Sequence, residues 1–166
     1  MYKIWLFPFL LLFFHYSANA QADWTLKRTN DGINIYTKTV SSSGLKGIKV
    51  KCSLPAKLSQ MVALIMDVDA GEDWVYGTKS STLLKKVSPS ELYYYSEVDI
   101  PWPLSNRDFI AHLIVSQDPR TKVVTINGPT ESNYLPVKKN IVRVNHSNGK
   151  WILVRRNLTN NSSSCF

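Results

Sequence analysis

Few residues in this chain of 166 are spaced for acid–base or nucleophilic chemistry. Asp108 and His112, four residues apart, share one face of an expected strand and come closest to a catalytic pair. A general acid–base histidine must lie within hydrogen-bond reach of its carboxylate, whereas four residues of a strand span roughly 13 Å. The spacing also suggests no Ser-His-Asp or Cys-His arrangement. The sequence therefore predicts a protein that is not an enzyme.

Metal chemistry is not expected either. The three histidines, His15, His112 and His146, are isolated from one another, and the two cysteines, Cys52 and Cys165, form no Cys-x-x-Cys motif. Two free thiols are the favoured state of these cysteines, and a disulfide between them is the alternative in an oxidising compartment. We expect no metal and no cofactor.

The most specific stretch is residues 99–109, which read Asp-Ile-Pro-Trp-Pro-Leu-Ser-Asn-Arg-Asp-Phe. Each proline fixes its own φ and disfavours helix in the residue before it, so Ile100 and Trp102 should be extended and the indole should project from a stiff corner. Neighbouring residues of a strand point to opposite faces. Arg107 and Asp108 should therefore not pair with each other, and each needs another partner.

Strands are the main elements expected around this corner. Between residues 55 and 68, apolar residues recur at three- and four-residue spacing, which predicts a short amphipathic helix. At least some of the acidic residues between Asp67 and Asp73 should begin a second turn or helix, where the helix dipole favours them. Short turns join the strands, which implies an antiparallel meander. The expected strands are residues 33–40, 45–54, 82–87, 91–99, 109–117, 122–127, 141–146 and 151–155.

Two of these strands bear on function. Residues 109–115 are mostly apolar on both faces, and residues 91–100 carry large side chains on both. A sheet with one face in water does not need this pattern. Either another layer covers the second face, or the sheet curls around an interior. Curled antiparallel sheets with apolar concave faces commonly hold an apolar ligand.

Residues 1–20 have the pattern of a secretory signal peptide. An unbroken apolar run at residues 4–14 follows one lysine, and Ala-Asn-Ala at 18–20 forms an A-x-A cleavage site. An uncleaved membrane anchor is the alternative. We expect an exported protein, periplasmic or extracellular, with one domain at residues 21–156 and a polar, disordered tail at 157–166.

The chain has a formal net charge of +8, and its basic residues gather near its end. No acidic residue follows Glu131. Such a region attracts anionic membrane surfaces transiently, while solvated outer faces of strands are the alternative. Nucleic acid is not an expected partner, because no basic helix or aromatic RNA-binding signature accompanies the charge. The residues of this predicted membrane contact are Lys138, Lys139, Arg143, Lys150, Arg155 and Arg156.

Three groups of residues resemble the START family of lipid-transfer domains, especially its short exported bacterial members. They are Trp24 with Gly-Ile-Asn-Ile-Tyr at 32–36, Asp67-Val68 with Trp74, and above all Pro-Trp-Pro-Leu-Ser-Asn-Arg-Asp at 101–108. The likeness runs from about Trp24 to Trp151. It implies an α+β helix-grip fold, in which a curved antiparallel sheet grips a long C-terminal helix around an apolar tunnel. It also implies binding and transfer of one lipid or other apolar small molecule, without covalent chemistry, metal or cofactor.

The chain departs from the family pattern after Trp151. Residues 155–166 are polar and non-periodic, so the long C-terminal helix is expected to be missing. A truncated member is the favoured explanation, and partnership with another chain is the alternative. Apolar area on the cavity side of the sheet would then face water. A non-binding remnant and a protein-interaction domain are therefore alternatives to a lipid carrier, and a cyclase- or hydrolase-like enzyme of the same fold class is a weaker one.

Eight residues are candidates for ligand binding, and each has a structural alternative. Trp74 and Tyr76 follow the expected helix, where an opening loop should lie. Tyr94, Phe109 and His112 either line the cavity or belong to the core.

The other three candidates belong to the Pro-Trp-Pro corner. Trp102 is favoured as a structural plug, with the tunnel wall as the alternative. Arg107 and Asp108 either orient a polar ligand group or form ion pairs that lock the fold, and the second role is favoured.

Overall fold

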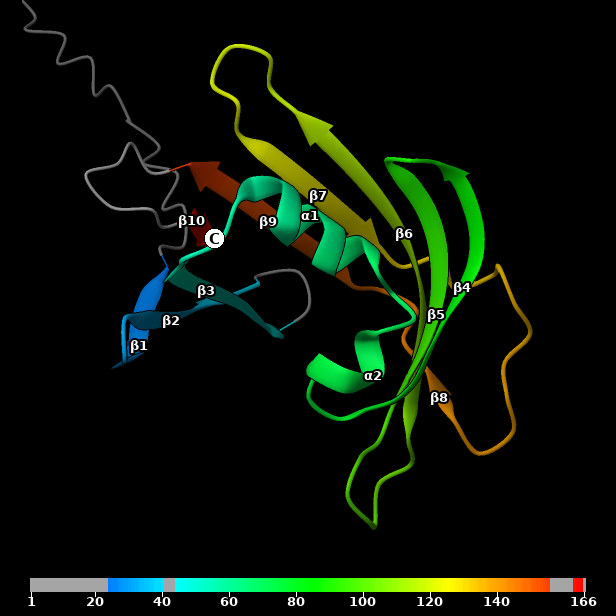
Figure 1. The fold of residues 1–166 in the computed structure, drawn as a ribbon. Coiled ribbons are helices and arrows are strands. Elements are labelled where there is room, and N and C mark those ends of the chain that lie inside the picture. The colour runs from blue at the N-terminus through cyan, green and yellow to red at the C-terminus, as the bar shows by residue number, and fades with distance from the viewer. Residues whose placement is uncertain (1–23, 41–43, 156–162, 166) are drawn as a thin grey trace, which may run out of the picture.

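A curved, mostly antiparallel sheet carries two short helices on one face (Figure 1). The structure is a computed structural model that describes residues 24–40, 44–155 and 163–165. The expected fold class, an α+β helix-grip sheet, is confirmed, and among the described residues no long C-terminal helix is present. The predicted signal peptide at residues 1–20 and most of the predicted tail lie outside the described residues.

The strands of the sheet follow the order β1-β2-β3-β10-β9-β7-β6-β5-β4, and β8 pairs with β6 outside this path. Apart from β8, the strands pair antiparallel. The bounds are β1 Thr25–Asn30, β2 Ile33–Thr39, β3 Lys46–Leu54, β4 Thr78–Ser88, β5 Glu91–Val98, β6 Arg107–Gln117, β7 Val124–Pro129, β8 Val142–Arg143, β9 Asn148–Arg155 and β10 Ser163–Cys165.

Two segments differ from the expected strands. Residues 141–146 form only the short β8, which pairs parallel with Arg107 and Asp108 of β6. A strand of two residues has no periodic pattern to reveal it, and the buried side chain of Arg143 fixes its place, as described below. Residues 163–165, expected in the disordered tail, form β10, which pairs with β3 and β9.

Helices α1 (Leu58–Met66) and α2 (Gly71–Trp74) confirm the two helical segments expected from the sequence. Glu72 and Asp73 lie in the first turn of α2, where the dipole favours acidic side chains. No helix in the described ranges is long and apolar enough to cross a bilayer. Met61 and Ile65 of α1, and Val68 just after it, pack on the sheet. Together with side chains of the strands they form the core, which consists of Met61, Ile65, Val68, Leu92, Leu113, Val124, Ile126 and Leu153.

Two acidic side chains tie the helical segment to the edge strand β4. The Leu83 N–H donates to Oδ1 of Asp69 over 2.8 Å, and the Ser81 N–H donates to Oε1 of Glu72 over 3.1 Å. Unpaired N–H groups on a sheet edge invite pairing with another chain. The two carboxylates therefore position α2 and also cap part of this edge.

Apolar side chains on one face of β2 and β3 are exposed. Ile48 is 71% exposed and Val50 is 41% exposed. The register places them opposite Thr37 and Ile35 on the same face. This face is separate from the core under α1.

We predict that Leu153→Ala lowers the free energy of unfolding by about 2–5 kcal/mol, because Leu153 is fully buried in the core and its loss leaves a cavity. Urea denaturation followed by circular dichroism measures the loss. The control Ile48→Ala, at an exposed position, should change it by less than about 0.5 kcal/mol. Equal losses in the two variants would contradict this assignment of the core.

Candidate ligand-binding site

A cavity of about 450 Å³ lies between the concave face of β5–β6 and the segment that carries α1 and α2. Its size falls in the range of about 300–1,000 Å³ that small-molecule sites occupy. Most of its lining is apolar. The strands contribute Tyr94, Ser96, Val98, Phe109, Ala111, Leu113 and Trp151, and the helical segment contributes Ile65, Val68, Gly71, Trp74 and Val75.

Strand alternation decides which side chains reach the cavity. Alternate residues of β6, from Arg107 through Phe109, Ala111 and Leu113, face it. Tyr94 of β5 lies opposite Ala111 in the register and faces the cavity with them. The cavity wall is thus one face of β6, which the sequence marks as apolar on both faces, together with one face of β5, which carries large side chains on both.

Aromatic side chains form part of this wall. The rings of Tyr94 and Phe109 meet edge to face, with centroids 5.8 Å apart and planes at 85°. Burial raises the pKa of Tyr94 to about 12, so its hydroxyl stays protonated at neutral pH. Tyr94 can therefore offer a hydrogen bond to a ligand, but it does not supply a base.

Gly128 allows the floor of the cavity to pack closely. A Cβ at this position would lie 2.8 Å from Cδ2 of Leu113 and 3.5 Å from the ring of Trp151. Both neighbours line the cavity. The missing side chain lets them meet across β7.

The structure brings four of the eight predicted site residues to the cavity. Trp74, Tyr94, Arg107 and Phe109 line it. Asp108 and His112 do not, because they occupy the alternate positions of β6 and face the outer side of the sheet.

Tyr76 and Trp102 lie outside the cavity for a different reason. Tyr76 is fully exposed, and Trp102 is 92% exposed in the loop between β5 and β6. The interpretation of Trp102 as a structural plug is therefore wrong, and Trp102 does not line the cavity wall either. The loop projects beyond the ends of both strands (Figure 1).

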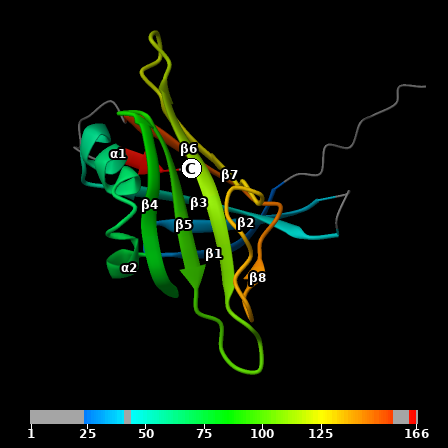
Figure 2. The same ribbon diagram turned by 90° about the vertical axis from the view of Figure 1, so that its right-hand side faces the viewer.

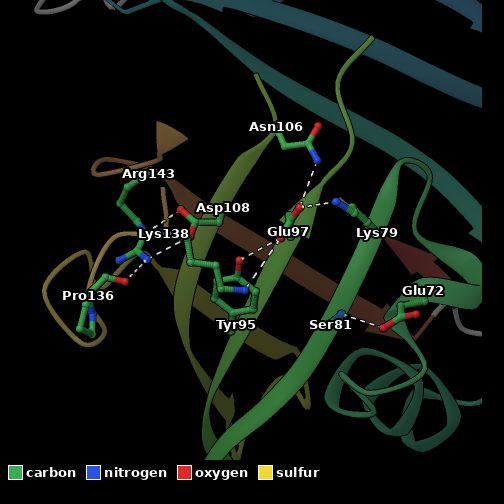
Figure 3. A network of polar contacts seen from close by, with 10 residues as sticks. All are labelled: Glu72, Lys79, Ser81, Tyr95, Glu97, Asn106, Asp108, Pro136, Lys138 and Arg143. Atoms are coloured by element: carbon green, nitrogen blue, oxygen red, sulfur yellow. Dashed lines mark hydrogen bonds and ion pairs between the residues drawn. The ribbon is translucent and has the colours of Figure 1, made fainter. Parts of the chain in front are cut away.

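Asp108 forms a buried ion pair with Arg143, which confirms the favoured fold-locking role. Nε and Nη2 of Arg143 donate to the two oxygens of Asp108 over 2.7 and 3.0 Å. The Asp108 carboxylate raises the pKa of Arg143. Figure 3 shows Arg143 also reaching Pro136, and its remaining N–H groups donate to the carbonyl oxygens of Ser132 and Leu135.

This pair corrects the predicted membrane contact. Arg143 is only 7% exposed, so it cannot belong to a basic surface. Nζ of Lys138 lies 3.9 Å from Oε2 of the buried Glu97 on β5. Lys150 and Arg155 belong to β9, and strands β7 and β6 lie between β9 and β5 in the sheet. Arg156 lies outside the described residues. Contact of Lys138, Lys139, Lys150 and Arg155 with an anionic membrane stays a prediction.

Glu97 is the second polar centre on the outer face. Asn106 Nδ2 donates to Oε1 of Glu97 over 3.0 Å, and Lys79 lies 3.0 Å from the same oxygen (Figure 3). Hydrogen bonds from Asn106 and then Lys79 lower the pKa of Glu97, against the opposing effect of burial. Asn106 also accepts a hydrogen bond from the Ile100 N–H over 3.2 Å. One asparagine thus ties both ends of the Pro-Trp-Pro loop to β5.

His112 pairs with Glu91 rather than with Asp108, as the strand spacing predicts. Its Nε2 lies 2.8 Å from Oε1 of Glu91, and its ring stacks on Tyr93 with centroids 4.0 Å apart. Tyr134 stacks on the other side of Tyr93 at 4.8 Å. These contacts lie on the outer face, where they hold the 130–144 segment against the sheet (Figure 2).

Sequence reasoning missed several lining residues. Ser81, Ser96 and Trp151 face the cavity, yet none was singled out. The signal for Ser96 was present, because it interrupts the run of Leu92, Tyr94 and Val98 on one face of β5. No comparable signal marks Ser81 in the sequence.

A curved antiparallel sheet that encloses an apolar cavity beneath short helices defines a helix-grip protein suited to small apolar ligands. A family model, the START domain, matches residues 12–163. The chain therefore belongs to the START family. The match begins within the predicted signal peptide, whose cleavage stays a prediction.

Relatives and solved structures agree with this assignment. An uncharacterized protein of Pseudomonas aeruginosa is 28% identical over 141 residues, which are 84% of this chain and 69% of that protein. The phosphatidylcholine transfer protein of Mus musculus is 33% identical over 131 residues, which are 74% of this chain and 58% of that protein. The chain thus spans less than two thirds of this mouse relative.

The STAR-related lipid transfer protein of Xanthomonas axonopodis superposes with a TM-score of 0.79 at 28% identity, covering 86% of this chain and 77% of that one. Human STARD10, at 16% identity, shares the fold with a TM-score of 0.70, covering 86% of this chain and 58% of that one. The family model, the mouse relative and the Xanthomonas axonopodis structure support lipid binding and transfer in general.

We predict that Asp108→Asn lowers the free energy of unfolding by about 3–5 kcal/mol, because it leaves the buried guanidinium of Arg143 without its counter-charge. Urea denaturation of Asp108→Asn, Arg143→Met and the double variant measures the coupling. The double variant should lose less than the sum of the single losses. Additive losses would contradict a direct pair.

We also predict an acid-sensitive contribution from Glu97. Its folded pKa lies below the ordinary 4.5, so its stabilising effect is present above that value and is lost as pH falls through the folded pKa. Asn106→Ala removes the largest cause and should destabilise the protein more at about pH 6 than at about pH 3. Unfolding in urea at both pH values measures this, with Asn127→Ala as the control. An equal cost of Asn106→Ala at both pH values would refute the link.

Proposed function

We propose that this chain binds one lipid or other apolar small molecule in the cavity and transfers it without covalent chemistry. The observation that carries the proposal is the apolar cavity on the concave face of β5–β6. The names of the relatives, which include phosphatidylcholine transfer proteins, favour an acyl lipid as cargo. His112 and Asp108, which come closest to a catalytic pair in the sequence, lie on the other side of the sheet and do not face the cavity.

Exposed aromatic residues beside the cavity supply a route for loading. Trp74 lines the cavity and is 47% exposed, and it is followed by the fully exposed Tyr76. The Asp99 N–H donates to the Gly77 carbonyl over 2.8 Å, which joins this segment to the loop that carries Trp102 and Leu104. Tryptophan and tyrosine favour the boundary between lipid and water. In this proposal these side chains contact a donor or acceptor membrane.

Export, with action in the periplasm or outside the cell, is part of the proposal. It rests on the apolar run and the Ala-Asn-Ala site of residues 1–20. A protein that carries apolar molecules across an aqueous compartment has a use for such a cavity.

Native mass spectrometry of the protein purified from cells tests the binding. A defined adduct of lipid mass on the monomer is expected. An adduct-free monomer would contradict the proposal. A dimer without adduct would favour the alternative of a protein-interaction domain, which the exposed apolar side chains of Ile48 and Val50 support.

We predict that Trp102→Ala slows transfer of fluorescent phosphatidylcholine between vesicles by roughly tenfold, since burial of a large apolar side chain is worth about 1.5–3 kcal/mol. The fluorescence change on mixing donor and acceptor vesicles measures the rate. Binding in solution and the urea midpoint should not change, because the side chain is exposed. Trp24→Ala, at an exposed tryptophan that does not line the cavity, is the matched control. Equal rates for Trp102→Ala and Trp24→Ala would exclude this membrane contact.

A further inference from the structure

Two serines lie side by side on the cavity wall. Ser81 of β4 is directly opposite Ser96 of β5 in the register, and both line the cavity. Directly opposed residues of an antiparallel pair share a face, with Cβ atoms about 4.5–5.5 Å apart. Ser81 is 7% exposed and Ser96 is 4% exposed. The wall therefore carries two adjacent hydroxyl groups that belong to buried residues.

Neither hydroxyl has a hydrogen-bond partner among the described residues. The contact that Ser81 makes with Glu72 uses its backbone N–H. Within the same residues, no side-chain oxygen or nitrogen that is sealed from solvent lacks a partner. The two hydroxyls must therefore open onto the cavity. Buried polar groups without partners cost free energy, and a ligand that supplies a partner recovers it.

Gly71 packs directly against Ser81. A Cβ on Gly71 would lie 3.0 Å from Oγ and 3.1 Å from Cβ of Ser81. A larger residue at the start of α2 would therefore press against the hydroxyl. Gly71 also lines the cavity, so the start of α2 and Ser81 belong to the same wall.

An anionic group is disfavoured beside Ser81, because the carboxylate of Glu72 accepts a hydrogen bond from the Ser81 backbone N–H. Asp67 and Arg107, which also line the cavity, carry opposite charges. Phe109, opposite Ser96, adds an apolar neighbour. Two hydroxyl donors beside a carboxylate match an uncharged oxygen, and a carbonyl oxygen can accept from both because it has two lone pairs.

We infer that Ser81 and Ser96 donate hydrogen bonds to one uncharged oxygen of the bound lipid, either an acyl-ester carbonyl or an alcohol hydroxyl. This inference rests on the proposed function, which gives the cavity an apolar occupant. The pair then fixes how deep the ligand sits, with its apolar part against Phe109, Ala111 and Leu113. It selects for lipids that have such an oxygen at that depth.

Binding of three probes to the full chain tests the inference. The probes are diacyl phosphatidylcholine, its dialkyl ether analogue, which lacks the ester carbonyls, and a long-chain alcohol. Native mass spectrometry titrations give the dissociation constants. We expect the unmodified protein to bind the diacyl lipid, or the alcohol, at least about tenfold more tightly than the ether analogue.

The variant Ser81→Ala/Ser96→Ala should lose that preference and leave binding of the ether analogue unchanged. Ser80→Ala is the matched control, because Ser80 is opposite Glu97 on the other face of the sheet and should bind as the unmodified protein does. Loss confined to the diacyl lipid assigns the ester carbonyl, and loss confined to the alcohol assigns the hydroxyl.

Two results would overturn the inference in different ways. If the unmodified protein binds all three probes with equal affinity, the serine pair does not select the ligand, although the proposed lipid binding stands. This comparison needs no variant and holds even if the double variant fails to fold. If the unmodified protein binds none of the three probes, both the inference and the proposed function fail.

Discussion

Strand β6 has buried side chains on both of its faces, and their alternation separates the apolar cavity from the polar network on the outer side of the sheet. Phe109, Ala111 and Leu113 face the cavity, whereas Asp108 and Ile110, both fully buried, face the outer side. A shift of one residue in its pairing with β5 would place a carboxylate in the cavity and phenylalanine in the polar network. The buried Asp108–Arg143 pair opposes such a shift, because Asp108 has its charge partner only on the outer side.

The polar residues of the Pro-Trp-Pro motif thus act mainly on the side of the sheet away from the ligand. Asp108 holds Arg143, whose guanidinium gathers three carbonyl groups of the 130–144 segment. Asn106 joins Glu97 to the start of the loop. Both contacts brace β5 and β6 from behind. The cavity wall can then remain apolar and partly open, since its shape does not depend on side chains inside it.

Much of the fold follows from local pattern, and the site follows only in part. The alternation in β6 and the spacing around α1 are local, so the strands, the helix and the absence of an Arg107–Asp108 pair could be predicted. The burial of Arg143 could not be predicted, because its partner Asp108 is 35 positions away in the sequence. From local sequence alone, such an arginine cannot be distinguished from one on the surface. The environment of Trp102 could not be predicted, because the flanking prolines fix the direction of the backbone but not the residues that pack against the indole. Ser81 faces inward through bulged pairing in β4, which strict alternation does not predict.

The contrast between the two faces argues for where selectivity resides. On the outer side, Asp108, Glu97 and Arg143 are all paired, so that face is complete within the chain. On the inner side, the hydroxyls of Ser81 and Ser96 have no hydrogen-bond partner among the described residues and are open to the cavity. An apolar cavity wall binds a ligand through the apolar area that it buries. Such a wall discriminates only weakly between ligands of similar shape. Hydroxyls that lack partners in the free protein penalise any cargo that fails to supply an acceptor, so discrimination between lipids falls to these few polar atoms.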